Sequence, residues 1–408
     1  MSDLSTSVEK AKMDLVHIDT IINFVFGIPH VAENIFKSLS DNDLIQCLLV
    51  SKTWMDFAKK ILLPRWKGQL LKACKEGRTE IVKILLDNGD DTDLNASSYD
   101  ATGWFRRTPF TWACENGHEA VAELLVNHPG FEADKVDEYG KTNLMWASEK
   151  GFDKTVQRLL SKMDITAINK KDRYGATAFM DAIKSKNESV ADQLLNLEGI
   201  EVDSVDDRDG KSCLILAIEK GLDQTVKRFL TKLSITDINK KDISGNTALM
   251  YAIKNKNECV VDQLLTLEGI EVDSVDPDGW TCLMWASIKN LDQIVVKLLP
   301  KLSPESIKKC DNYGYNAFMN ACLNNSDKVL QTMFAKSPMI NWDFNAQNFG
   351  NTGFILACMF KKERAVDLIL ANYQRLKIDL KIKNKNGNTG MDYWHGASGS
   401  NYQGKFGR

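Results

Sequence analysis

The ten residues LEGIEVDSVD occur twice in the chain, at residues 197–206 and again, letter for letter, at residues 267–276. The likeness continues on the N-terminal side, where LSKMDITAINKKD from Leu160 matches LTKLSITDINKKD from Leu230. The two copies form a block of about seventy residues that is written twice. Because an active site is usually built once, the duplication indicates a repeated structural unit.

A shorter period lies inside this block. Glycines recur 34 to 37 residues apart, each three residues after an acidic or amide side chain, at Gly140, Gly175, Gly210, Gly245, Gly279, Gly314, Gly350 and Gly387. Periods of this size are typical of stacked repeats, in which one unit cannot bury its apolar face alone. The sequence therefore predicts an all-α solenoid.

One copy illustrates the expected unit. Residues 172–175 predict a turn, because Gly175 accepts the positive φ that closes it. Thr177 is the predicted N-cap of a short first helix, in which the small Ala182 allows close packing. After a polar break at residues 185–187, apolar residues at helical spacing predict a second helix.

This unit resembles the ankyrin repeat, whose first helix carries T-P-L-H-x-A. The matching segments are TPFTWA from Thr108, TNLMWA from Thr142, TAFMDA from Thr177, SCLILA from Ser212, TALMYA from Thr247, TCLMWA from Thr281, NAFMNA from Asn316 and TGFILA from Thr352. An irregular copy starts at Leu70 and a partial copy at Asn384. The resemblance implies an array over residues 67–395, with about nine repeats and a partial one, followed by a flexible tail at 396–408.

Two positions of the repeat carry unusual residue types, a methionine where the family has His and a cysteine after the small Ala. The family's His is replaced mostly by Met, at Met145, Met180, Met250, Met284 and Met319. Stacking is therefore expected to depend more on apolar contact, for which Met adapts well. Cys74, Cys114, Cys322 and Cys358 all follow the small Ala of the first helix, which predicts buried packing residues rather than metal ligands.

Composition narrows the classes of function. The net charge is −3, so no basic excess favours nucleic acid or anionic lipid, and no run of 18 apolar residues predicts a membrane span. Nine cysteines without a C-x-x-C pair indicate a reducing compartment, cytoplasmic or also nuclear. The five histidines form no metal-binding pattern. We expect no metal, no cofactor, no small-molecule substrate and no catalytic residues. The Gly-Lys-Thr at 140–142 lacks the first glycine of a phosphate loop.

The segment 28–66 does not fit the repeat, and it predicts three short helices after an N-terminal tail, residues 1–27, that is expected to be partly disordered. Its pattern resembles an F-box, with Ile28-Pro29, then Ile35-Phe36, Asp43-Leu44 and Val50-Ser51-Lys52. In that family the domain docks a Skp-type adaptor of a cullin ubiquitin ligase. The resemblance implies adaptor binding through Pro29, Ile35, Leu39, Leu44 and Val50. The alternative is that these helices only cap the solenoid.

These features predict a non-catalytic substrate receptor of a cullin-type ubiquitin ligase, with the adaptor on the F-box and a target protein on the repeats. The alternative is a scaffold or inhibitor that binds a protein without a ubiquitin role. An enzyme has little support, because no non-repeat segment is long enough for a catalytic domain.

We expect the target to bind at one position per repeat, two residues after the apolar anchor of the first helix and about 200° around the helix from it. The eight residues, called the ladder here, are Trp112, Trp146, Asp181, Leu216, Tyr251, Trp285, Asn320 and Leu356. In the ankyrin family the first helices line the binding groove, and large aromatics often anchor interfaces. The alternative is that these rings pack between neighbouring first helices. Exposed rings at the hairpin tips are predicted at Tyr139, Tyr174, Tyr313 and Phe349.

Overall fold

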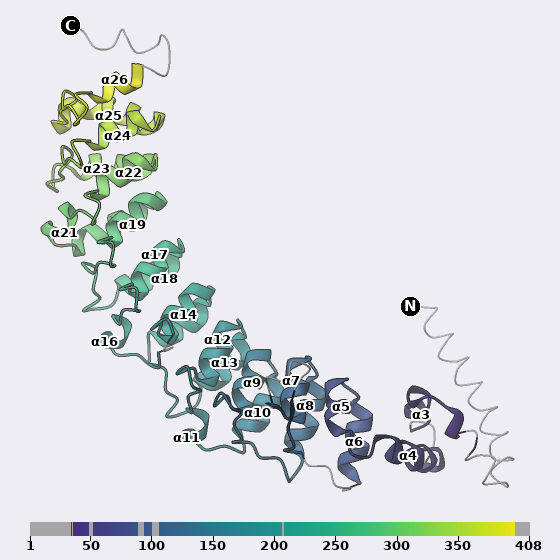
Figure 1. Cartoon of the computed structure of the whole chain (residues 1–408). Helices are drawn as coiled ribbons and strands as arrows, with labels where there is room; N and C mark the ends of the chain where they lie inside the picture. Colours follow the sequence, from purple (N-terminus) through teal and green to yellow (C-terminus); the bar gives the residue numbers. More distant parts are fainter. Residues whose placement is uncertain are drawn as a thin grey trace, which may run out of the picture. The chain divides into compact units, whose positions relative to one another are not determined.

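The structure is a computed structural model that describes residues 34, 36–48, 52–88, 94–99, 106–205 and 208–395. Helices dominate these residues, as the repeat pattern predicts (Figure 1). The chain divides into two compact units, Met1–Ala167 and Ile168–Arg408, and each is described by itself. Among the described residues, no helix combines the length and apolarity needed to cross a membrane.

Within the described part of the first unit, the segment that resembles an F-box contributes two helices. These are α3 (Asp41–Cys47) and α4 (Lys52–Trp66), and Ser40 is the N-cap of α3, with its hydroxyl accepting from the Asp43 N–H. Three helix pairs follow: α5 (Leu70–Lys75) with α6 (Thr79–Asp87), α7 (Pro109–Glu115) with α8 (Glu119–Asn127), and α9 (Asn143–Lys150) with α10 (Asp153–Leu160).

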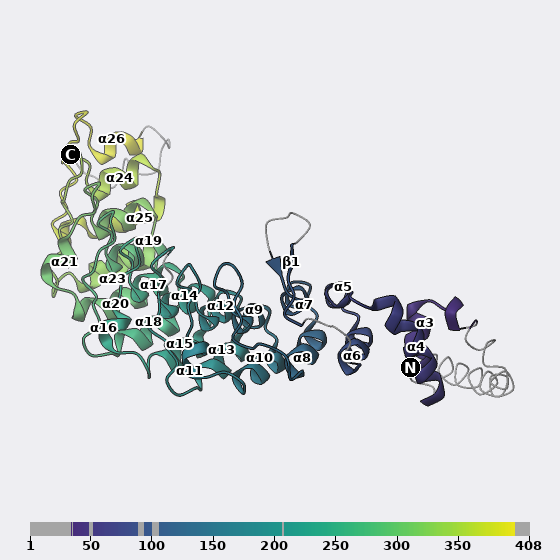
Figure 2. The same ribbon diagram turned by 60° about the horizontal axis from the view of Figure 1, so that its bottom comes forward.

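Packing in the first unit is sequential. The first helices α5, α7 and α9 pack in order, as do the second helices α6, α8 and α10, while α4 packs against α6. A strand pair that the repeat pattern does not predict, β1 (Ser98–Tyr99) and β2 (Arg106–Arg107), is antiparallel and lies beside α7 (Figure 2). It belongs to the long insertion between the first two repeats, where the regular spacing is lost.

The second unit continues the same two-layer order. Its first helices are α12 (Ala178–Lys184), α14 (Cys213–Lys220), α17 (Ala248–Lys254), α19 (Cys282–Lys289), α22 (Ala317–Leu323) and α24 (Gly353–Met359), and α26 (Gly390–His395) packs on the last of them. Its second helices are α13 (Glu188–Leu195), α15 (Asp223–Phe229), α18 (Glu258–Leu265), α20 (Asp292–Leu298), α23 (Asp327–Lys336) and α25 (Glu363–Leu376).

Short helices occupy the connections between repeats. They are α11 (Ile165–Ile168), at the division between the units, α16 (Ile235–Ile238), the 3-10 helix η1 (Leu299–Lys301) and α21 (Pro304–Lys308). The copied block explains α11 and α16, because they hold the same position in its two copies.

Each first helix starts where the sequence predicts. The Thr177 hydroxyl accepts from the Met180 N–H, and Thr247 does the same for Met250. The methionines that replace the family's His are all fully buried, at Met145, Met180, Met250, Met284 and Met319. Cys74, Cys114, Cys322 and Cys358 are likewise buried and free, so the packing role predicted for them is confirmed.

The turn glycines adopt positive φ, as predicted, and in several repeats they also approach the next turn closely. Gly279 has φ +81°, and a Cβ there would lie 3.0 Å from the backbone nitrogen of Asn312. Successive turns are joined by backbone hydrogen bonds, such as Asn312 N–H to the Asp278 carbonyl at 2.8 Å. Glycine is therefore required here by conformation and by space.

Asparagine side chains join neighbouring repeats where the family's His is absent. Asn239 donates from Nδ2 to the Gly269 carbonyl at 2.9 Å and accepts from the Glu271 N–H at 3.0 Å. Asn169 makes the same pair of bonds to Gly199 and Glu201 in the other copy of the block. We call each such two-bond contact an asparagine clamp. A third clamp joins Asn345 to Lys377 and Asp379.

Candidate protein-binding surfaces

A polar network closes the small helical bundle at the start of the chain. The Arg65 guanidinium donates to the carbonyls of Lys37 and Leu39, at 2.8 and 3.1 Å, and to Asp41 Oδ1 at 2.8 Å. The indole of Trp66 donates to Asp41 Oδ2 at 2.8 Å. Burial raises the pKa of Asp41, but the hydrogen bonds and the charge of Arg65 outweigh it, so the pKa lies below its usual value. The network fixes α4 against the start of α3.

Two of the five predicted adaptor contacts lie among the described residues. Leu44 is fully buried with Phe36, so its side chain belongs to the core of the bundle. Leu39 is half-buried and keeps apolar surface, and the structure adds Ile45 and Leu48 as half-buried apolar neighbours on or next to α3. The predicted contacts Pro29, Ile35 and Val50 fall outside the described residues.

The bundle is joined to the first repeat by side chains as well as by sequence. Arg78, which precedes α6, donates to Asn42 Oδ1 on α3 at 2.6 Å. The Lys72 ammonium of α5 lies 5.0 Å from the centre of the Trp66 ring. These contacts, together with the packing of α4 on α6, place the bundle and the first repeats in one unit.

The ladder divides into two sets by exposure. Its four aromatic members are half-buried, at Trp112, Trp146, Tyr251 and Trp285. Its other four members are buried, at Asp181, Leu216, Asn320 and Leu356. Buried side chains offer little surface to a partner. Of the ladder residues, only the four aromatic ones therefore remain accessible to a target protein. The sequence spacing predicts the direction in which a side chain points, but it does not predict how far neighbouring repeats bury that side chain.

Two ladder rings are held by the turn of their own repeat. The indole of Trp146 donates to Asp137 Oδ2 at 3.2 Å, and the hydroxyl of Tyr251 donates to Asp242 Oδ2 at 2.7 Å. Each aspartate lies nine residues before its ring. Asp137 Oδ1 accepts two backbone N–H groups of the turn, so one carboxylate orders both the turn and the ring. Burial and Asp242 raise the pKa of Tyr251, which keeps its hydroxyl a donor.

Lysine side chains lie over the faces of three ladder rings. Lys75 lies 4.3 Å from the Trp112 ring centre, Lys141 4.5 Å from Trp146, and Lys254 4.2 Å from Trp285. Burial lowers the pKa of Lys254, although Asp276, 3.7 Å away, acts in the opposite direction. Such cation–π contacts are worth about 0.5–1 kcal/mol at exposed sites, so they orient the rings within the array before any partner binds.

The hairpin tips form a second surface, in which exposed fractions run from 41% at Tyr174 through 60% at Tyr313 to 70% at Phe349. Tyr139 is half-buried. Ile243, which was not predicted, is 72% exposed in the corresponding turn of its repeat, one position earlier than the rings. The sequence signal that could have predicted this exposed side chain is an apolar residue two places before a turn glycine.

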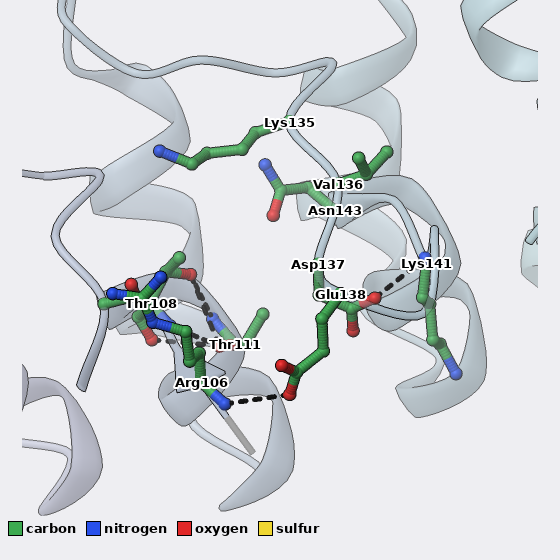
Figure 3. Close-up of a pocket in the computed structure, with 10 residues that line it drawn as sticks. Arg106, Thr108, Thr111, Lys135, Val136, Asp137, Glu138, Lys141 and Asn143 are labelled. Atoms are coloured by element: carbon green, nitrogen blue, oxygen red, sulfur yellow. Dashed lines mark hydrogen bonds between the residues drawn. The ribbon is translucent and has the colours of Figure 1, made fainter. Parts of the chain in front are cut away.

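A pocket of about 400 Å³ lies in the first unit between the β1–β2 ribbon and the turn of the third repeat (Figure 3). Arg106 enters it by a backbone N–H that donates to Glu138 Oε1 at 3.1 Å. Lys135 donates to the Asn95 carbonyl, and Thr108 and Thr111 cap α7 together. Most of its polar lining is thus engaged within the protein, and among the described residues no cluster of three potential metal ligands occurs.

The repeated helix pairs, capped turns and stacked tips define an ankyrin array preceded by a bundle with the F-box pattern. A model of ankyrin repeats matches residues 70–172, 130–206, 179–267 and 249–348, and the F-box domain model matches residues 28–66. The chain belongs to the ankyrin-repeat family and carries an F-box domain ahead of the array. Both are non-catalytic modules that bind other proteins.

A curated relative supports the repeat assignment over a short region. The putative ankyrin repeat protein YahD of Escherichia coli (strain K12) is 35% identical over 97 residues, which are 22% of this chain and 45% of the E. coli protein. The chain therefore spans less than half the length of this relative.

Proposed function

We propose that the chain is a non-catalytic substrate-recognition subunit of a cullin-type ubiquitin ligase, in which the F-box binds a Skp-type adaptor and the array binds the target protein. The observation that carries the proposal is the F-box domain ahead of an ankyrin array, and the joint between them is consistent with it. Arg65 and Trp66 fix α4 through Asp41, and Arg78 ties α3 to the first repeat. A receptor needs such a joint, because transfer is efficient only when the target is held in a defined position.

The adaptor would meet the half-buried apolar side chains of the bundle, Leu39, Ile45 and Leu48, with Leu44 supporting them from the core. The competing function is a scaffold or inhibitor whose bundle only closes the end of the array. The joint to the first repeat suits either function, so adaptor binding is the property that separates them.

The test titrates the purified full chain with a purified Skp-type adaptor and follows binding by calorimetry. The variant Leu39→Glu puts a charge on the proposed contact, and the backbone carbonyl that Arg65 uses remains. We expect at least a tenfold loss of affinity. The matched control is Lys83→Glu on the exposed side of α6, which we expect to bind like the parent chain.

Absence of adaptor binding by the folded parent chain would overturn the receptor role and leave the scaffold. Equal binding by Leu39→Glu and the parent chain would instead reject the proposed contact surface. Circular dichroism of each variant shows whether the helices are retained.

A further inference from the structure

Three positions of each regular repeat lie around its first helix: the residue before the N-cap, the ladder residue and the seventh residue after the N-cap. In three repeats the first and last of these form an ion pair. Arg107 pairs with Glu115 at 2.5 Å, Lys211 pairs with Glu219 at 2.8 Å, and Lys141 pairs with Glu149. In these repeats the surface around the first helix is therefore charged and internally neutralised.

The pattern changes in the repeats of α19, α22 and α24, where these positions carry no charged side chain. Their accessible apolar residues, called the apolar strip here, are Trp280, Trp285, Ile288, Tyr315, Leu323 and Met359. Met359 is 37% exposed and the adjoining Phe360 56%, while the other five residues are half-buried. None of the three helices contains an acidic residue.

The strip is continuous within the second unit. Helices α19, α22 and α24 pack side by side in that order, as Figure 1 also shows. The rings of Trp280 and Trp285 are 4.8 Å apart between centres. Helices packed about 10 Å apart place three first helices over roughly 20 Å, which matches roughly 13 residues of a bound helix.

Two buried polar groups beneath this surface lack a hydrogen-bond partner among the described residues. They are Trp285 Nε1 and Nδ2 of Asn320, both at ladder positions. The donors of Trp146 and Tyr251, at the same positions of other repeats, are satisfied by turn aspartates. Both atoms are buried, so they do not face a partner, and they show only that no turn carboxylate holds the ladder residue in these two repeats.

Lysines lie along the edge of the strip, and the acidic Asp276 and Asp278 precede Trp280 in the turn before α19. Lys254 on α17 is paired with Asp276 at 3.7 Å, whereas Lys289 ends α19 and Lys361 follows Phe360. Lys289 is half-buried and Lys361 is exposed. An apolar segment with acidic flanks would bury the strip and meet the ammonium groups of Lys289 and Lys361, whereas basic flanks would be repelled by them.

We propose that the apolar strip binds an apolar segment of the target protein, flanked by acidic residues. The inference rests on the proposed function of the array in holding a target, and it names the kind of segment that the target presents. The ion-paired repeats then serve as the polar part of the array, and the apolar strip serves as its anchoring part.

The test uses the immobilised full chain and a library of random 16-residue peptides displayed on phage. We expect the enriched peptides to share an apolar core and to carry more Asp and Glu than Lys and Arg beside it. The best peptide is then synthesised and titrated by fluorescence anisotropy. The variant Met359→Glu with Phe360→Glu should lower its affinity at least tenfold, since one new charge lies on the strip and the other adjoins it.

The matched control is Met339→Glu, which places the same charge on an 83% exposed methionine after α23 and off the strip. This control should bind the peptide like the parent chain. If the double variant loses helix, Leu323→Gln on α22 replaces it. Failure to enrich peptides, preference for basic flanks, or equal binding by the strip variants and the parent chain would overturn the proposal.

Two further measurements separate the proposed binding from two other outcomes. Sedimentation tests whether a second copy of the chain occupies the strip, and adaptor titration tests whether the F-box function has failed. Sedimentation of the free chain should show one mass that the double variant leaves unchanged. A dimer that dissociates on these substitutions would assign the strip to a second copy and overturn the proposal. Adaptor titration of the same double variant should match the parent chain, so a failed strip and a failed F-box function give different results.

Discussion

At the scale of single residues, Asp41 makes the bundle at the start of the chain sensitive to acid. Its folded pKa lies below the ordinary value of 3.8, so the ionised form stabilises the fold at neutral pH and this stabilisation is lost as pH falls through the folded pKa. We expect Asp41→Asn to cost about 1 kcal/mol at pH 7, since the pair with Arg65 is partly exposed.

Hydrogen exchange of residues 41–66 measures this locally, and the cost corresponds to about fivefold faster exchange. The difference between Asp41→Asn and the parent chain should shrink as the pH falls below 3.8 and through the lowered folded pKa, because the carboxyl then becomes protonated. A difference that stays unchanged over this fall in pH would mean that Asp41 acts by packing rather than by its charge.

Lys256 holds a strained backbone between α17 and α18. Its φ is +58°, a region that costs a side-chain-bearing residue about 1–2 kcal/mol. Gly221 fills the equivalent position one repeat earlier, with φ +75° and open space where a Cβ would lie. We expect Lys256→Gly to stabilise the chain by about 1 kcal/mol and Gly221→Ala to destabilise it by about 1 kcal/mol, both from urea unfolding. Destabilisation of the chain by Lys256→Gly would show that the side-chain contacts of Lys256 outweigh the backbone strain.

Residue-level features follow the sequence closely when they are local. The N-cap at Thr177, the positive φ of Gly175 and the burial of Met180 each depend on a few neighbouring residues and the repeat pattern, and all were predicted. The burial of Leu216 was not predicted, because it depends on side chains of adjacent repeats.

At the scale of elements, the asparagine clamps connect one repeat to the next. The Asn239 clamp reaches 30 and 32 residues along the chain, to Gly269 and Glu271. The sequence contained a signal, because INKKD is identical in both copies of the block. Its partners could not be predicted from local spacing, since they depend on how neighbouring repeats stack.

Removal of one asparagine clamp should weaken only the contact between the two repeats that the clamp joins. We expect Asn239→Ala to cost about 1–2 kcal/mol, because it removes two hydrogen bonds at an exposed site, and Asn239→Asp to cost less, since it keeps the acceptor. Urea unfolding gives the free energies, and hydrogen exchange around Gly269 and Glu271 locates the effect. Gln224→Ala, on the exposed side of α15, is the control. An unchanged exchange rate at Glu271 in Asn239→Ala would show that the clamp contributes nothing.

At the scale of the whole molecule, the duplicated block implies that the array tolerates gain or loss of two repeats. Equivalent residues hold the two ends of the block. Lys162 donates to the Val126 carbonyl of the preceding repeat at 2.6 Å, and Lys232 donates to the Leu195 carbonyl, also at 2.6 Å. If residues 162–231 are deleted, Lys232 follows Ser161 and takes the place of Lys162.

The deletion should therefore give a shorter, folded protein, because each repeat contacts mainly its neighbours and the new neighbours have nearly the same sequence. Circular dichroism should show the helical signal per residue unchanged, and the dependence of unfolding free energy on urea should fall with the surface removed. Adaptor affinity should stay equal to that of the parent chain, since the F-box unit keeps its joint through Arg65 and Arg78.

A second deletion of seventy residues, 180–249, moves the junction into a first helix, where Phe179 is joined to Met250. It keeps the register of the repeat, because Met250 then takes the place of Met180 after the same N-cap, Thr177. This variant should fold as well, since the period of the block, rather than the choice of junction, decides which side chains meet. Loss of the helical signal in both deletions would show that the block is not a modular unit of this array.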